Sequence, residues 1–111
     1  MELKVDIRVP MGLLVPEAAD FIAECEAAGF SGVGLHDRQH SGRDVHLTLA
    51  LAAERTCKLT LYPATTNPVT RHPSVTASSA QSLEEIAPGR ICSTVGSGYL
   101  AVVNIAIPKP H

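Results

Sequence analysis

The feature that most constrains the fold of this chain is a regular alternation of strand-like and helix-like segments. Runs typical of strands begin near residues 3, 32, 58 and 91, so roughly 26 to 33 residues separate one strand from the next. Helical patterns fill the intervals between them. Alternating units of this kind predict an α/β chain of the order βαβαβαβ, in which right-handed crossovers join the strands of a parallel sheet.

The first two units show this pattern clearly. Residues 3–9 alternate between apolar and charged side chains, which is the period of a half-buried strand. Pro16 suits the first turn of a helix and Gly29 suits its end. Between them, apolar residues recur at helical spacing and predict one buried stripe. The short apolar run at residues 32–35 then predicts a second strand.

The later units follow the same pattern. Asp44 is expected to cap a helix over residues 45–55, because its carboxylate can accept free backbone N–H groups. Residues 58–62 predict the third strand. Pro73 is expected to begin a third helix that ends before Pro88-Gly89, and residues 91–95 predict a fourth strand. The spacing fits an eightfold barrel and also a small doubly wound sheet, so periodicity alone leaves both open.

Composition limits the classes of function. With 111 residues, 45% of them hydrophobic, and a net charge of -2, we expect one folded domain and no disordered tail. Aromatic residues make up only 4%, so the core must consist of Val, Ile, Leu and Ala. Nine basic against eleven acidic residues give no footprint for nucleic acid. No apolar run approaches ~18 residues, and no signal peptide is recognisable, so we expect no membrane partner and a cytoplasmic location.

Chemistry is expected in the loops that follow the carboxyl ends of the strands. The second loop, residues 36–44, is the densest polar cluster in the chain and could bind an anion or polarise a carbonyl. A solvated loop that ends in a helix cap is the alternative. A zinc site is disfavoured, since the candidate ligands lie on two separate loops and form no His-Glu-x-x-His motif. Those candidates are His36, Asp37, His40, His46 and His72.

The remaining candidate segments are less specific. The third loop, residues 63–73, carries three prolines, with Thr, Asn and backbone groups that could bind a flat heterocycle, and Arg71 or His72 could favour an anion. A turn-rich connection is equally consistent. Gly96-Ser97-Gly98 lacks the further residues of a dinucleotide fingerprint, so a simple turn is favoured. The three cysteines (Cys25, Cys57 and Cys92) are expected to be buried, inert thiols.

Taken together, these segments resemble the luciferase-like family of flavin- and deazaflavin-dependent oxidoreductases, which includes bacterial luciferase and methylenetetrahydromethanopterin reductase. Residues 65–73, Thr-Thr-Asn-Pro-Val-Thr-Arg-His-Pro, resemble the family's segment after its third strand. Residues 82–90 resemble the segment before the fourth strand, and residues 96–104 resemble the loop after it. The resemblance covers residues 3–110 and implies the N-terminal half of a (β/α)8 barrel. Residues 1–111 would then be one partial, truncated barrel domain.

The resemblance also implies a function. Family members bind FMN or coenzyme F420 and carry out hydride transfer or monooxygenation on a small organic substrate. Asp37 matches the family's Asp after the second strand, whereas Arg38 stands where a His is usual; Asp37 and His40 are therefore the catalytic candidates. Cofactor-binding candidates, with a non-proline cis peptide expected at the Ala64–Thr65 bond, are Ala64, Thr65, Thr66, Asn67, Gly96, Ser97 and Gly98.

Partners and alternatives complete these expectations. We expect a small-molecule substrate and a homo-oligomer, with no metal. The main alternative is a non-enzymatic half-barrel that self-associates without a cofactor, because the outer strands of a partial sheet would have unpaired edges. A metal-dependent hydrolase is a more distant alternative.

Overall fold

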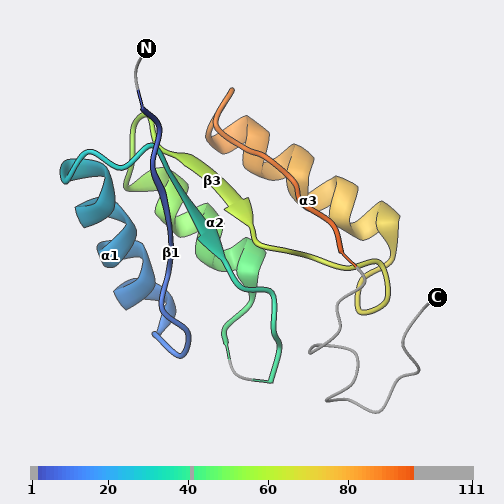
Figure 1. Cartoon of the computed structure of the whole chain (residues 1–111). Coiled ribbons are helices and arrows are strands. Elements are labelled where there is room, and N and C mark those ends of the chain that lie inside the picture. Colours follow the sequence, from blue (N-terminus) through green and yellow to red (C-terminus); the bar gives the residue numbers. More distant parts are fainter. Residues whose placement is uncertain (1–2, 41, 97–111) are drawn as a thin grey trace.

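A computed structural model describes residues 3–40 and 42–96 of the chain (Figure 1). Within this part, parallel strands alternate with helices in the order β1 (Asp6–Arg8), α1 (Val15–Ala27), β2 (Gly32–Leu35), α2 (Val45–Glu54), β3 (Thr60–Pro63) and α3 (Pro73–Ile86). The predicted α/β alternation is therefore confirmed. No helix of these residues combines the length and apolar character that a membrane crossing requires.

The sheet has the strand order β1-β2-β3, and both pairs of neighbouring strands are parallel. Ile7 on β1 pairs with Val33 on β2, and Val33 pairs with Leu61 on β3. These three side chains point toward the helices, which lie on one face of the sheet (Figure 1). The other face carries polar residues and glycines, because successive side chains of a strand point to opposite sides.

The helix starts follow the local sequence. The amide of Leu14 donates to the Glu17 carboxylate at 3.0 Å, next to Pro16 in the first turn of α1. The predicted cap of α2 is confirmed, since Asp44 Oδ2 accepts a hydrogen bond from the Leu47 amide at 2.8 Å. Helix α3 begins at Pro73, as predicted. In each case a residue that suits a helix N-terminus fixes where the helix begins.

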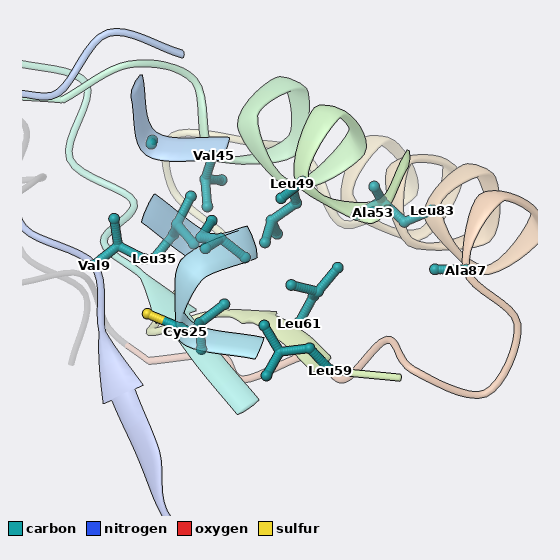
Figure 2. Packing of buried hydrophobic residues seen from close by; sticks show 14 residues of the cluster. Val9, Cys25, Leu35, Val45, Leu49, Ala53, Leu59, Leu61, Leu83 and Ala87 are labelled. Carbon is teal, nitrogen blue, oxygen red and sulfur yellow. The ribbon is translucent and has the colours of Figure 1, made fainter. Parts of the chain in front are cut away.

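The core lies between the sheet and the helices and is aliphatic, as the composition predicted (Figure 2). Ile22, Val33, Leu49 and Leu61 are fully buried. Helix α2 contacts both α1 and α3, and it contributes Val45, Leu49 and Ala53 to the same hydrophobic cluster (Figure 2). Burial of this apolar surface is the main stabilising contribution in the described part of the chain.

The prediction for the three cysteines was right for one of them. Cys25 is buried on α1, whereas Cys57 and Cys92 are exposed. Cys57 lies in the turn that precedes β3 rather than in an apolar element. Ile91 packs against the core, so the alternation along an extended segment directs Cys92 to the opposite face of the sheet.

The predicted fourth strand is wrong as a continuous element. Residues 91–95 run parallel to β3 but form only two isolated bridges, Leu61 with Ile91 and Thr66 with Val95. Pro63 lies between these bridges and has no backbone N–H, so it cannot donate the next ladder hydrogen bond. The Thr94 hydroxyl instead donates to the Pro63 carbonyl. The segment therefore lies where a fourth strand was expected, with an interrupted ladder.

Gly34 in β2 shapes the face of the sheet that points away from the helices. A Cβ atom on Gly34 would lie 2.9 Å from both Ala64 Cβ and Tyr62 Cε2. The absence of that atom lets the Tyr62 ring extend over β2 and donate a hydrogen bond to Asp6 on β1 at 2.8 Å. Burial, followed by this bond to Asp6, raises the pKa of Tyr62 to about 12. The phenol therefore acts as a donor at neutral pH.

Candidate functional site

The loops after β2 and β3 leave the sheet at the same edge, because the carboxyl ends of parallel strands lie together. Asp37 follows β2 and Thr66 follows β3. The Thr66 hydroxyl donates a hydrogen bond of 2.7 Å to Asp37 Oδ2. Both residues are buried, with 6% of Asp37 and 1% of Thr66 exposed. Two candidates from separate loops therefore meet in one place.

Arg71 joins the same cluster from the far end of the third loop. Its Nη1 pairs with Asp37 Oδ2, and its Nη2 donates to Asp44 Oδ1 at 3.0 Å. The guanidinium therefore bridges two carboxylates that lie at opposite ends of the second loop. Burial alone would raise the pKa of Asp44, but the Leu47 amide and Arg71 together hold that pKa below its ordinary value.

Asn67 has a structural role that the sequence did not reveal. Its Oδ1 accepts hydrogen bonds from the Val69 amide, the Thr70 amide and the Thr70 hydroxyl at 2.8 to 3.0 Å. An Asn side chain that bonds to backbone groups two or three residues ahead forms a tight turn. Its Nδ2 is buried and has no hydrogen-bond partner among the residues that the structure describes. The carbonyl thus shapes the loop, while the amide donor remains available.

A hollow of about 310 Å³ lies next to this turn. Thr66, Asn67 and Pro68 line one side, Ser93 and Val95 line another, and α3 supplies the rest. The α3 residues lie on one face of the helix, and they are Pro73, Thr76, Ala77 and Ala80. The lining is mostly apolar, with a few polar residues, Thr66, Asn67, Thr76 and Ser93, which is the usual character of a small-molecule site.

The other cofactor candidates lie around the end of β3. The Ala64–Thr65 peptide bond is cis, as predicted. The Gly96 amide donates to the Thr66 carbonyl at 2.9 Å, and a Cβ atom on Gly96 would lie 3.0 Å from Thr65 Oγ1. A glycine at this position therefore allows the two segments to approach closely. Ser97 and Gly98 lie outside the described residues.

The histidines do not join the cluster in the way that Asp37 does. His40 is exposed in the second loop, and none of the hydrogen bonds or ion pairs described above involves it. Burial, and then the charges of Arg8 and Arg38, lower the pKa of His36. Burial and Arg71 also lower the pKa of His46, although the nearby carboxylates of Asp44 and Asp37 act to raise it. Across residues 3–40 and 42–96, no group of three or more His, Cys, Asp and Glu side chains is placed to hold a metal ion.

The parallel βα units and the buried polar cluster at the carboxyl ends of their strands define the class of this protein. It is an α/β protein of the barrel type, in which ligand sites lie at the carboxyl ends of the strands. The sequence pattern of the luciferase-like monooxygenase family matches residues 11–111. The chain therefore belongs to the luciferase-like monooxygenase family. This confirms the resemblance drawn from residues 65–73 and 82–90.

Curated relatives include two 5,10-methylenetetrahydromethanopterin reductases. The protein from Methanolobus tindarius is 38% identical over 87 residues, which cover 78% of this chain and 26% of the relative. The protein from Methanopyrus kandleri is 43% identical over 63 residues, which cover 56% and 18% of the two chains. This chain thus spans about a quarter or less of the length of these relatives.

Solved structures share the fold. The coenzyme F420-dependent tetrahydromethanopterin reductase from Methanopyrus kandleri has a TM-score of 0.89 and 30% identity, over 97% of this chain and 31% of that one. An F420-dependent secondary alcohol dehydrogenase, in complex with an F420–acetone adduct, has a TM-score of 0.79 at 20% identity, over 88% and 32%. A monooxygenase from Streptomyces bottropensis has a TM-score of 0.71 at 22% identity, over 86% and 33%.

Proposed function

We propose that this chain forms the first part of a deazaflavin-dependent oxidoreductase that acts on a small organic substrate. The observation that carries the proposal is the cluster of Asp37, Thr66 and Arg71, buried at the carboxyl edge of a fold that belongs to the luciferase-like family. The chain covers about a third of the solved reductase. The activity of a whole barrel would require more βα units than the described residues form.

Coenzyme F420 is the cofactor that we propose, because the related reductase from Methanopyrus kandleri is F420-dependent. FMN is the alternative, since it presents a similar tricyclic face. When bound, either group would supply the hydride chemistry. Two features of this chain suit a flat heterocycle: the buried Asn67 amide that lacks a described partner, and the close approach of Gly96 to Thr65. Ala64 and Thr66, with Ser97 and Gly98, would complete the contacts.

We assign the transfer of protons to and from the substrate to residues of the second loop. Asp37 and His40 are the candidates for holding or moving a proton near the substrate. Asp37 is already paired with Arg71 and Thr66, whereas His40 is exposed on the same loop. We therefore propose His40 as the more accessible proton donor, with Asp37 as the buried carboxylate of the site. Hydride transfer is favoured over monooxygenation because two curated relatives, 38% and 43% identical to this chain, are reductases.

Titration of the purified 111-residue chain with coenzyme F420 and, separately, with FMN tests this proposal. We expect saturable quenching of F420 fluorescence with one site per chain, and weaker binding of FMN. Asn67→Asp is expected to weaken F420 binding about tenfold, the equivalent of about 1.4 kcal/mol. Gln81→Ala, an exposed change on α3, serves as the matched control. Tighter binding of FMN than of F420 would contradict the choice of cofactor.

Self-association without a cofactor is the second candidate, and a specific observation favours it. Leu3 and Val5 precede β1, which is an outer strand of the described sheet, and they are 84% and 46% exposed. Unpaired strand edges flanked by apolar side chains favour pairing between chains. A chain that binds neither F420 nor FMN, yet sediments as a dimer, would favour this function over the oxidoreductase.

A further inference from the structure

We propose that Arg71 is a positioning residue, which holds the Asp37 carboxylate against Thr66 and so fixes the gap between the loops after β2 and β3. The inference rests on the proposed function for the identity of the ligand that this gap would receive. It concerns a residue for which the sequence suggested only general anion binding. The described contacts give Arg71 a more specific role.

The first argument is the geometry of the guanidinium. One nitrogen pairs with Asp37 near the start of the second loop, and the other bonds to Asp44 at its end. Arginine presents a rigid planar fork that can engage two acceptors at once. Asp44 is itself fixed, because its other oxygen caps α2 through the Leu47 amide. Arg71 therefore connects Asp37 to the N-terminus of a core helix.

The second argument is that Arg71 is held from its own side as well. The three hydrogen bonds to Asn67 Oδ1 define the turn through Thr70, which immediately precedes Arg71. Thr66, in the same loop, donates to the same Asp37 oxygen that Arg71 contacts. Neither bond occupies Asp37 Oδ1. The third loop therefore holds one oxygen of this carboxylate and leaves the other outside both contacts.

The third argument is energetic. A buried ion pair contributes little net stability, because desolvation of the two charges offsets their attraction. Removal of one partner is nevertheless costly, because it leaves a buried charge without compensation. The side chain of Asp37 is only 5% exposed and that of Arg71 is 18% exposed. A pair of this kind, placed at the carboxyl ends of the strands, is best explained by the position in which it holds the Asp37 carboxylate.

The first experiment does not depend on a cofactor. A double-mutant cycle of Arg71→Ala and Asp37→Asn is followed by thermal unfolding of the full 111-residue chain. We expect each single variant to lower the melting temperature, and the double variant to lower it no more than the worse single variant. Arg71→Lys keeps the charge but loses the fork, and it replaces Arg71→Ala if that variant does not fold. Additive losses in melting temperature would overturn the proposal.

The second experiment measures positioning through binding. We expect Arg71→Ala to weaken F420 binding at least tenfold, and added methylguanidinium to restore most of that loss. Arg55→Ala is the matched control, because Arg55 pairs with Asp20 at the surface and makes no described contact with Asp37, Thr66 or Arg71. Its affinity for F420 should equal that of the unmodified chain.

The two experiments separate the inference from the proposed function. If the unmodified chain binds F420 and Arg71→Ala binds it equally well, the positioning role is wrong. If the unmodified chain does not bind F420 at all, the proposed function fails, while the double-mutant cycle still decides whether Arg71 and Asp37 act as one unit. Restoration of binding by methylguanidinium would support the role, since a merely unfolded variant would not respond.

Discussion

Asp44 serves two parts of the chain with its two carboxylate oxygens. One oxygen caps α2 through the Leu47 amide, and the other bonds to Arg71 in the third loop. A residue chosen from the sequence as a helix cap is therefore also a link to the candidate site. The cap was predictable from local sequence, because Asp at this position satisfies free N–H groups. The link to Arg71 was not, since 27 residues separate the two in sequence.

This double role gives a pH-dependent prediction. Burial alone would raise the pKa of Asp44, but the Leu47 amide and Arg71 lower it below the ordinary value of 3.8. The folded state therefore favours the ionised form, and this contribution to stability is present above pH 3.8 and lost as the pH falls through the lower folded-state pKa. We expect Asp44→Ala to reduce the free energy of unfolding at pH 7 by about 1 kcal/mol. Urea unfolding at pH 7 and below pH 3 measures this difference.

Asp44→Asn is the control for that prediction, because it keeps an oxygen that can cap the helix but removes the charge. Its loss of stability at pH 7 should be smaller than that of Asp44→Ala. The gap between the unmodified chain and Asp44→Ala should narrow in acid. A gap of the same size at both pH values would contradict the assignment of the contribution to the ionised carboxylate.

At the scale of elements, Arg90 determines how the end of α2 meets the start of β3. Its Nη2 donates to the carbonyls of Ala53 and Thr56 at 3.0 and 3.2 Å. Its Nη1 donates to the Thr56 hydroxyl at 2.8 Å and to the Leu59 carbonyl at 3.2 Å. Arg90 thus provides donors to the carbonyl end of a helix, where a positive charge is favourable.

We expect Arg90→Ala to lower the free energy of unfolding by about 1.5–3 kcal/mol, the range for hydrogen bonds to a charged group. Arg90→Lys should retain part of this stability, because a single ammonium cannot reach all four acceptors. Equilibrium urea unfolding measures both variants. Arg55→Ala, at an exposed ion pair, is the control and should cost at most about 1 kcal/mol. Equal losses for Arg90→Ala and Arg55→Ala would show that Arg90 does not secure the helix end.

The segment at residues 91–95 shows where element prediction fails. Its apolar character and position after a helix predicted a strand, and it does lie parallel to β3. Pro63 prevents a continuous ladder because it supplies no N–H at the required register. The proline was visible in the sequence, but the residue that would pair with it depends on the register. Only the folded sheet defines that register.

At the scale of the whole molecule, the described sheet is covered on one face only. Helices α1, α2 and α3 pack on the face that carries Val33 and Leu61 (Figure 1). The opposite face carries Asp6 and Arg8, which are exposed, with Tyr62. This arrangement buries the apolar side chains of the sheet under the helices. The chain shares its fold with the solved reductase, of which it covers 31%.

The exposed apolar side chains that precede β1 lead to a prediction about assembly. We propose that the chain forms a homo-oligomer through the edge of β1, where Leu3 and Val5 are exposed. The double variant Leu3→Lys/Val5→Lys should shift the chain toward monomer, because charged residues at a strand edge oppose pairing. Sedimentation velocity over a range of concentrations measures the shift. Leu47→Lys on α2, where Leu47 is also exposed, is the control and should leave assembly unchanged.

The sequence by itself determined the order of the elements from β1 to α3, the aliphatic core, the cap at Asp44, the start of α3 at Pro73, and the family to which the chain belongs. These features depend on periodicity, on residues close together in the chain, and on a local motif at residues 65–73. The tertiary structure alone decided that Arg71 bridges Asp37 and Asp44, and that Cys57 and Cys92 are exposed. The physical reason is that such contacts depend on strand register and loop path, which bring together residues about 30 positions apart without any local signal.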